Sequence, residues 1–392
     1  MAISTHDMEL ILEGLVFIAS QGLQEIDLQE NFHVIQKLGD GSYGSVLTVQ
    51  DKKTDQKMAL KILDRNKTSE FSFLKEFSMS FFLSSHPNII GSFGIAFKTC
   101  DSFAFTQELS IGDLFSLIRP HEGLPEDTVK RCAVQISNAL EFIDSKGLVH
   151  LDIKPENILV FDEDCNCIKI TDFGFSHVKG TLIKSRSGTT SYKAPEMIQL
   201  TDKDTLLANF TLDVWAFGIV LHCLLTGEFP WHSAVFTDKA YSNFVEWQNN
   251  FESSEPPSPW RRFTPGVLKM FRGLLASDCN RRSKSTEVFM FLGACWKEQI
   301  LESTEGTLED ANTMQENLSV ETVLWNCYQE SDICKDVCAR IIENVSSSIS
   351  SITSVLSTLS SYLTSESSEY ESEEPPKDWN SVLNASLIMD EK

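Results

Sequence analysis

Apolar side chains recur at helical spacing near the start of the chain, within residues 7–20. This spacing predicts one amphipathic helix that packs on the domain that follows it. From residue 32 to residue 63 the pattern changes to short apolar runs separated by Gly-rich and Asp-Lys-Lys-Thr-Asp turns. Such runs predict strands of an antiparallel sheet. The expected strands are residues 34–38, 45–50 and 57–63.

Helical patterns dominate the chain after these strands. Residues 71–83 are expected to form the first main helix, and helices prevail from residue 113 onward, with Pro125 tolerated near the start of a helix at 126–145. We therefore predict an α+β fold. It has two lobes: a small antiparallel β N-terminal lobe with one main helix, and a larger, mainly α C-terminal lobe.

The composition changes near residue 300, where Ser, Thr and Glu become frequent. This change predicts three regions: an N-terminal helical extension at 1–30, a catalytic domain at 31–298 and an acidic, Ser-rich tail at 299–392 that is mostly disordered when alone. Within the tail, apolar residues follow a heptad spacing over 338–364. Two alternatives stay open for this segment: an amphipathic helix that docks on a partner or on its own domain, and a solvated chain. The seam consists of Ile342, Val345, Ile349, Ile352, Leu356, Leu359 and Leu363.

The formal net charge is -23, and residues 301–392 hold 18 acids and 4 bases. Such a charge would repel a nucleic-acid backbone, so no nucleic-acid partner is expected. No secretory signal opens the sequence, and the longest apolar stretch near its start is too short to cross a membrane, so we expect no membrane span. We read the ten cysteines as reduced thiols of a cytoplasmic protein.

A glycine-rich turn lies between the first two expected strands, where residues 39–46 read Gly-Asp-Gly-Ser-Tyr-Gly-Ser-Val. Gly39, Gly41 and Gly44 would let backbone amides approach ATP phosphates, with Val46 on the strand that follows. A dinucleotide-binding turn is the rival interpretation, but it requires a helix after the third glycine. Residues 45–49 read instead as a strand.

The third strand carries Lys61 in the sequence Met-Ala-Leu-Lys-Ile. A lysine at this place can hold the α- and β-phosphates of ATP, and a glutamate of the next helix can pair with its ammonium group. Glu76 is favoured for this role, although Glu70 lies on the same stretch.

The most specific motif is His-Leu-Asp-Ile-Lys-Pro-Glu-Asn at residues 150–157, followed by Asp-Phe-Gly at 172–174. Asp152 is placed to orient a substrate hydroxyl as the catalytic base, and Lys154 to neutralise charge on the transferring phosphoryl group. Asn157 and Asp172 supply the oxygen ligands that Mg²⁺ prefers. Together these residues predict phosphoryl transfer with ATP and Mg²⁺ as cofactors.

These motifs resemble those of the eukaryotic protein kinase family over residues 31–298. The resemblance implies that Leu38, Ala59 and Leu159 also bind ATP, and that Gly174 and Ala-Pro-Glu at 194–196 delimit an activation segment. It further implies that Glu196 pairs with Arg282, and that Asp213 anchors the backbone of the catalytic loop.

Lys154 and Thr189 resemble the serine/threonine-specific branch, which implies protein substrates that carry Ser or Thr. Three stretches, at 123–132, 244–248 and 260–264, are similar to the SH3-domain-binding kinase family. The tail lacks a P-x-x-P step, so the sequence does not favour SH3 binding.

Two departures from the kinase pattern matter. Leu151 stands where the family usually has arginine, and a leucine cannot pair with a phosphate on the activation segment. The hinge is also one residue short, so either Thr106 or Gln107 borders the adenine pocket. These departures motivate an alternative function, a catalytically weak pseudokinase or scaffold that acts through nucleotide binding and its C-terminal tail.

Overall fold

The computed structural model describes residues 4–41, 44–184 and 189–298. The predicted tail and its heptad segment at 338–364 lie outside these residues.

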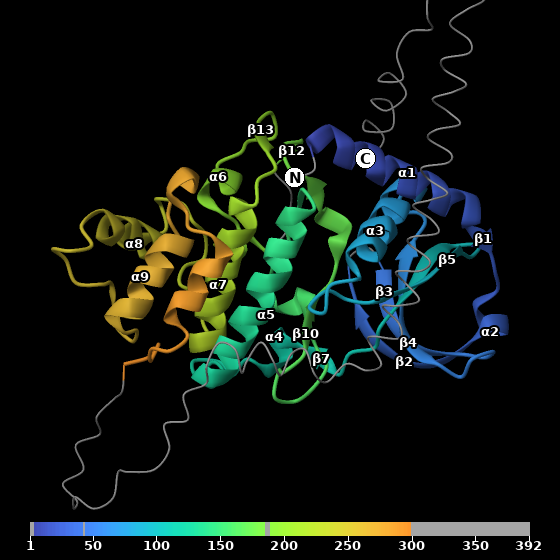
Figure 1. The fold of residues 1–392 in the computed structure, drawn as a ribbon, viewed down its shortest axis with the longest axis horizontal. Coiled ribbons are helices and arrows are strands. Elements are labelled where there is room, and N and C mark those ends of the chain that lie inside the picture. Colours follow the sequence, from blue (N-terminus) through green and yellow to red (C-terminus); the bar gives the residue numbers. More distant parts are fainter. Residues whose placement is uncertain (1–3, 42–43, 185–188, 299–392) are drawn as a thin grey trace, which may run out of the picture. The chain divides into compact units, whose positions relative to one another are not determined.

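A six-stranded sheet forms the core of the N-terminal part, in the order β1-β5-β6-β4-β3-β2 (Figure 1). All its neighbours are antiparallel except β1, which runs parallel to β5. The β3–β4 turn is fixed by Asp51, whose Oδ1 accepts hydrogen bonds from the backbone amides of Lys53 and Thr54. The strands are β1 (Gln24–Glu25), β2 (Phe32–Asp40), β3 (Gly44–Asp51), β4 (Lys57–Asp64), β5 (Ser92–Lys98) and β6 (Ser102–Gln107).

Three helices belong to this sheet-containing part: α1 (Thr5–Gly22), α2 (Leu28–Asn31) and α3 (Glu70–Leu83). Ser69 caps α3 by accepting a hydrogen bond from the amide of Ser72. Phe73 of α3 stacks on Phe103 of β6, with ring centroids 4.9 Å apart. Helix α1 lies against α3, so the main helix is held between the sheet and the N-terminal extension (Figure 1).

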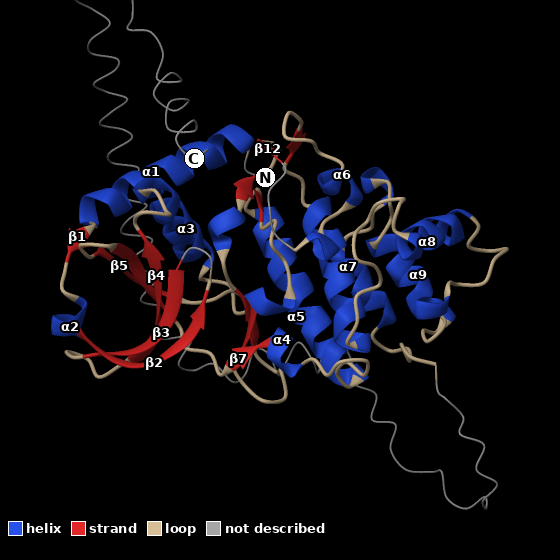
Figure 2. Cartoon of the chain, turned by 180° about the vertical axis from the view of Figure 1, so that it is seen from behind, coloured by secondary structure: helices blue, strands red, loops and turns tan. Residues whose placement is uncertain are grey.

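Helices gather in the second part of the chain, as Figure 2 shows. Its central helix, α7, is buried at every position from Leu212 to Thr226, as expected for a helix that is apolar on all sides. Gly227 ends α7 with φ +70°, and a Cβ there would lie 2.1 Å from the carbonyl oxygen of Arg119. The helices are α4 (Leu114–Leu117), α5 (Glu126–Ser145), α6 (Pro195–Ile198), α7 (Thr211–Thr226), α8 (Lys239–Asn249) and α9 (Pro265–Leu274).

Short strands and 3₁₀ turns lie between these helices. Strands β10, β9 and β7 form one small sheet, β11 pairs with β8, and β12 pairs with β13. The strands are β7 (Gly112–Asp113), β8 (Leu148–Val149), β9 (Ile158–Val160), β10 (Ile168–Ile170), β11 (His177–Val178), β12 (Leu182–Lys184) and β13 (Thr205–Leu207). The 3₁₀ turns are η1 (Pro155–Asn157), η2 (Phe173–Phe175), η3 (Thr190–Tyr192), η4 (Ser258–Trp260), η5 (Cys279–Arg281) and η6 (Ser285–Phe291).

The predicted α+β class is confirmed, with a small antiparallel sheet first and a mainly helical part after it. The extension also folds as α1, although β1, β5 and β6 were not among the expected strands. No helix among residues 4–41, 44–184 and 189–298 has both the length and the apolar character needed to cross a membrane.

His222 is a buried titratable group in the helical core. Its Nδ1 lies 3.0 Å from the carbonyl oxygen of Glu228, and the rings of Trp260, Phe263 and Phe271 surround it. Burial lowers the pKa of His222 to about 4. The unfolded chain takes up a proton below about pH 6.5 and the folded chain does not, so stability is lost as the pH falls from 6.5 toward 4.

Because only the unfolded chain protonates His222 in this range, we expect the unfolding free energy to fall by about 2 kcal/mol from pH 7 to pH 5. Denaturant unfolding at both pH values would measure this loss, and His222→Gln should reduce it by that amount. The matched control is His33→Gln, since His33 is exposed and should leave the pH dependence as in wild type. An unchanged pH dependence in His222→Gln would contradict the assignment.

Candidate active site

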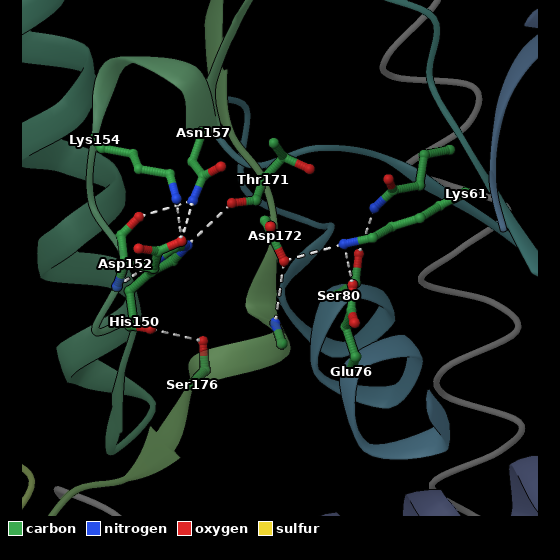
Figure 3. Close-up of polar contacts among 12 residues, drawn as sticks. Lys61, Glu76, Ser80, His150, Asp152, Lys154, Asn157, Thr171, Asp172 and Ser176 are labelled. Atoms are coloured by element: carbon green, nitrogen blue, oxygen red, sulfur yellow. Dashed lines mark hydrogen bonds and ion pairs between the residues drawn. The ribbon is translucent and has the colours of Figure 1, made fainter. Parts of the chain in front are cut away.

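Three charged side chains from three elements meet at one point. Lys61 lies in the middle of β4, and its Nζ is 2.5 Å from Oε1 of Glu76 in α3 and 3.0 Å from Oδ1 of Asp172 (Figure 3). Glu70, the alternative partner, lies at the start of α3 and its Oε2 is 3.7 Å from Nζ of Lys98 instead. The structure therefore brings Lys61 together with Glu76 and Asp172.

The opposite charges of Lys61 and Asp172 stabilise each other, whereas burial raises the pKa of Glu76. Burial alone would lower the pKa of Lys61, but the nearby carboxylates of Asp172 and Glu76 outweigh it and raise that pKa. Burial likewise opposes ionisation of Asp172, yet the Lys61 ammonium holds the pKa of Asp172 below its ordinary value. Lys61 is therefore a cation and Asp172 an anion at neutral pH.

The backbone at Asp172 has an unusual conformation. Its φ of +68° lies in the left-handed region, which costs free energy for a residue with a side chain. Its Oδ1 also lies 3.4 Å from the amide nitrogen of Gly174. A Cβ at Gly174 would lie 3.1 Å from Oε2 of Glu76, so glycine keeps room for the glutamate beside the turn.

The buried carboxylate of Asp213 binds the backbone of the loop after β8. Oδ2 of Asp213 accepts a hydrogen bond from the amide of His150 at 2.7 Å, and Oδ1 accepts one from Leu151 at 2.8 Å. Burial raises the pKa of Asp213 to about 7. Leu151 itself has φ +66°, and its side chain packs against the large apolar core. Asp213 thus fixes the strained start of the catalytic loop.

Two polar side chains of this loop, those of Lys154 and Asn157, converge on Asp152. Its Oδ2 accepts hydrogen bonds from Nζ of Lys154 at 2.7 Å and from Nδ2 of Asn157 at 2.8 Å (Figure 3). Nδ2 of Asn157 also donates to the backbone carbonyl of Asp152 at 2.8 Å. Because both bonds use the amide nitrogen, the carbonyl Oδ1 of Asn157 points away from them as an acceptor.

His150 links the Asp152 loop to the Asp172 segment. Its Nε2 lies 3.1 Å from the carbonyl oxygen of Thr171, and its own carbonyl accepts a hydrogen bond from Oγ of Ser176 at 3.3 Å. The side chain of His150 also meets the ring of Phe173 edge-on, with centroids 5.1 Å apart. These contacts fix Asp152 and Asp172 relative to each other.

The glycine-rich turn connects β2 to β3. The amide of Gly41 donates to the carbonyl of Gly44 at 2.7 Å. A Cβ at Gly44 would lie 1.8 Å from the carbonyl oxygen of Ile62, whereas nothing lies within 4 Å of one at Gly39. Gly44 is therefore needed for close contact between strands, and Gly39 leaves open space beside the turn.

The strand register shows which side chains share the Lys61 face of the sheet. Lys61 lies opposite Val46, and Ala59 lies opposite Gln107, so these residues point to the same side. Leu38, in the bulge between Lys37 and Gly39, is 44% exposed.

Two further expected residues lie in the helical part. Leu159 is on β9 opposite Asp113 and Lys169, partly buried against the large core. Thr189 is exposed and precedes the turn η3.

An ion pair between Arg282 and Glu196 lies at the end of the segment that follows Asp172. Nη1 and Nη2 of Arg282 lie 2.7 Å and 3.1 Å from the two carboxylate oxygens of Glu196. Arg282 also donates to the carbonyls of Thr211 and Ala276, and its guanidinium stacks over Trp215 at 5.0 Å. Its side chain is fully buried.

Comparison with known proteins matches the protein kinase domain family over residues 32–291. The serine/threonine-protein kinase SBK1 of Danio rerio is 46% identical over 297 residues, which cover 76% of each chain. The serine/threonine-protein kinase SBK2 of Rattus norvegicus is 36% identical over 297 residues, 75% of this chain and 82% of that protein. The chain belongs to the SH3-binding kinase family of serine/threonine kinases. The more distant kinase meng-po of Drosophila melanogaster is 35% identical over 283 residues, 71% of this chain and 62% of that protein.

The structure of this kinase answers the question left open at the hinge. Gln107, at the end of β6, faces α3, and its Nε2 donates to Oγ of Ser80 at 3.0 Å. Thr106 is fully buried on the opposite face, with no partner for its hydroxyl among the described residues. Gln107 therefore lies on the face of the sheet that carries Lys61, and Thr106 lies on the other face.

The contact between Glu108 and Lys169 was not predicted from the sequence. Glu108 follows β6, and its Oε2 accepts hydrogen bonds from Nζ of Lys169 at 2.6 Å and from the amide of Gly91 at 2.9 Å. Lys169 lies on β10, three residues before Asp172. A charged residue between two buried isoleucines was the signal that could have revealed this pair.

Proposed function

We propose that this kinase is catalytically active and transfers the γ-phosphoryl group of MgATP to serine and threonine hydroxyls of proteins in the cytoplasm. The observation that carries the proposal is the contact of Lys61 with both Glu76 and Asp172, at 2.5 Å and 3.0 Å. This contact requires β4, α3 and the Asp172 segment to be in place together, and phosphoryl transfer depends on such positioning.

The residues present fit a nucleotide and a divalent cation. The open space at Gly39 suits phosphate groups, and the ammonium of Lys61 offers them a positive charge. Oδ1 of Asn157 and the carboxylate of Asp172 are the hard oxygen donors that Mg²⁺ takes. When bound, Mg²⁺ would neutralise charge on the nucleotide phosphates.

The chain's own residues account for the remaining requirements. Asp152 accepts a hydrogen bond from the substrate hydroxyl, orients its oxygen and takes its proton at a carboxylate oxygen. Lys154, now 2.7 Å from Oδ2 of Asp152, brings a positive charge to the transferring group. Asn157 keeps the Asp152 carboxylate in one orientation through its Nδ2.

A second candidate function is a scaffold with little catalysis. It is favoured by Leu151, which packs against the core and cannot bind a phosphate of the activation segment. The hinge, which is one residue short, also favours the scaffold. Both functions include nucleotide binding, so only phosphate transfer separates them.

The test is transfer of labelled phosphate from MgATP by the purified full chain to a mixed-sequence peptide library. We expect labelling of serine and threonine peptides by wild type and loss of at least about 100-fold in Lys61→Met, because the substituted side chain has no charge for the phosphates. Lys57→Met on the same strand is the matched control, since Lys57 is exposed. ATP binding without any transfer by wild type would favour the scaffold.

A further inference from the structure

The N-terminal helix α1 packs against α3, the helix that carries Glu76 (Figure 1). Met8 of α1 is fully buried and Leu12 is 6% exposed, and both belong to the same apolar core as Met79 and Leu83 of α3. This packing ties α3 to the large apolar core, most of which comes from the helical part of the chain, and so restricts its movement. The extension is therefore built into the support of Glu76.

The second half of α1 continues this contact. Val16 and Ala19 pack against a separate core cluster that contains Phe73 and Phe77 of α3. The outer face of the same helix carries Leu10 and Phe17, which are 52% and 63% exposed. Both faces of α1 thus carry apolar side chains, but one face packs against α3 and the other is exposed.

Helix α1 also reaches the segment that follows Asp172. Oγ1 of Thr5 donates to the carbonyl of Lys179 at 2.9 Å. Gly180, with φ +86°, allows this approach, since a Cβ there would lie 3.1 Å from Oγ1 of Thr5. Nζ of Lys179 in turn lies 2.7 Å from Oδ1 of Asp144 in α5. One helix is fastened both to the Glu76 helix and to the start of the activation segment.

These two attachments involve the segments that carry Glu76 and Asp172, two members of the charged cluster. Glu76 depends on the position of α3, and Asp172 depends on the segment that runs through β11 to Lys179. Strand β11 pairs with β8, directly before His150. Leu151, which packs against the core, offers no charge for a phosphate that would order this segment.

We propose that α1 is a positioning element of the active site. Met8 and Leu12 hold α3 so that Glu76 stays on Lys61, and Thr5 holds the segment after Asp172, in place of ordering by a phosphate on the activation segment. This inference rests on the proposed kinase activity and concerns its regulation.

The test compares two double variants of the full chain that remove apolar bulk from opposite faces of α1. Met8→Ala with Leu12→Ala should lower kcat roughly tenfold or more, because a larger share of molecules has α3 displaced. Leu10→Ala with Phe17→Ala should keep kcat within about twofold of wild type. Met8→Leu, which conserves volume, should retain most of the activity.

A second readout does not depend on catalysis. The double variant Met8→Ala with Leu12→Ala is called the buried-face variant. Its hydrogen exchange, measured without substrate, should become faster in residues 70–83 and 177–181 and stay unchanged in α8 and α9. Thr5→Val removes one exposed hydroxyl and keeps the inference testable if the double variant does not fold. It should speed exchange in 177–181 and lower kcat roughly twofold to fivefold.

Phosphatase treatment of wild type completes the design and should leave kcat unchanged. Loss of activity on this treatment would overturn the inference, and so would unchanged exchange in both segments of the buried-face variant and of Thr5→Val. An inactive wild type would refute the proposed function, while the exchange measurements would still decide the role of α1.

Discussion

Replacing Asp152 with asparagine will lower kcat by roughly 10²- to 10⁴-fold and leave the affinity for MgATP within about twofold of wild type. The substituted amide has nearly the same shape and can still accept the hydrogen bonds that Lys154 and Asn157 donate to Oδ2. It cannot take the proton of a substrate hydroxyl. The loop should stay folded, and only the step that needs a base should fail.

Single-turnover transfer and equilibrium nucleotide binding, measured on the same preparation, would separate these two effects. Asp127→Asn is the matched control, because Asp127 is an exposed acid in the first turn of α5 and should keep wild-type kcat. Wild-type turnover in Asp152→Asn would remove the role assigned to this carboxylate.

Replacing Arg282 with leucine should destabilise the chain by about 3–5 kcal/mol. The substitution removes both hydrogen bonds to the Glu196 carboxylate and leaves that carboxylate without its cation. It also takes away the donors to the carbonyls of Thr211 and Ala276. Since the Arg282 side chain is fully buried, water cannot easily replace these partners.

Denaturant unfolding would measure this loss, with Arg281→Leu as the control. Arg281 is the exposed neighbour, so its substitution should change the unfolding free energy by no more than about 0.5 kcal/mol. A loss below about 1 kcal/mol in Arg282→Leu would mean that the pair contributes little to stability.

Local patterns predicted the elements that carry the chemistry. The expected helix at 126–145 is α5 (Glu126–Ser145), and the expected strand at 57–63 is β4 (Lys57–Asp64). These elements are determined by short-range periodicity and turn residues. The same holds for motifs such as residues 150–157, whose side chains act together because they lie on one loop.

Contacts between distant segments were less accessible from the sequence. Whether Thr106 or Gln107 shares the face of the sheet that carries Lys61 depends on the register of β4 with β6, and a shift by one residue would exchange them. The Glu108–Lys169 pair joins residues 61 positions apart. Spacing along the chain carries no information on such a meeting, because it is set by how the two parts pack.

The hydrogen bond between Gln107 and Ser80 connects the proposed nucleotide site to α3. A small-molecule inhibitor that fits beside an undisturbed Gln107 would bind with Glu76 in place. A larger one that displaces Gln107 must break its hydrogen bond to α3 and would favour molecules in which that helix has moved. Inhibitors of this enzyme should therefore fall into two classes, those that leave Gln107 in place and those that displace it. Each class would stabilise a different conformation of α3.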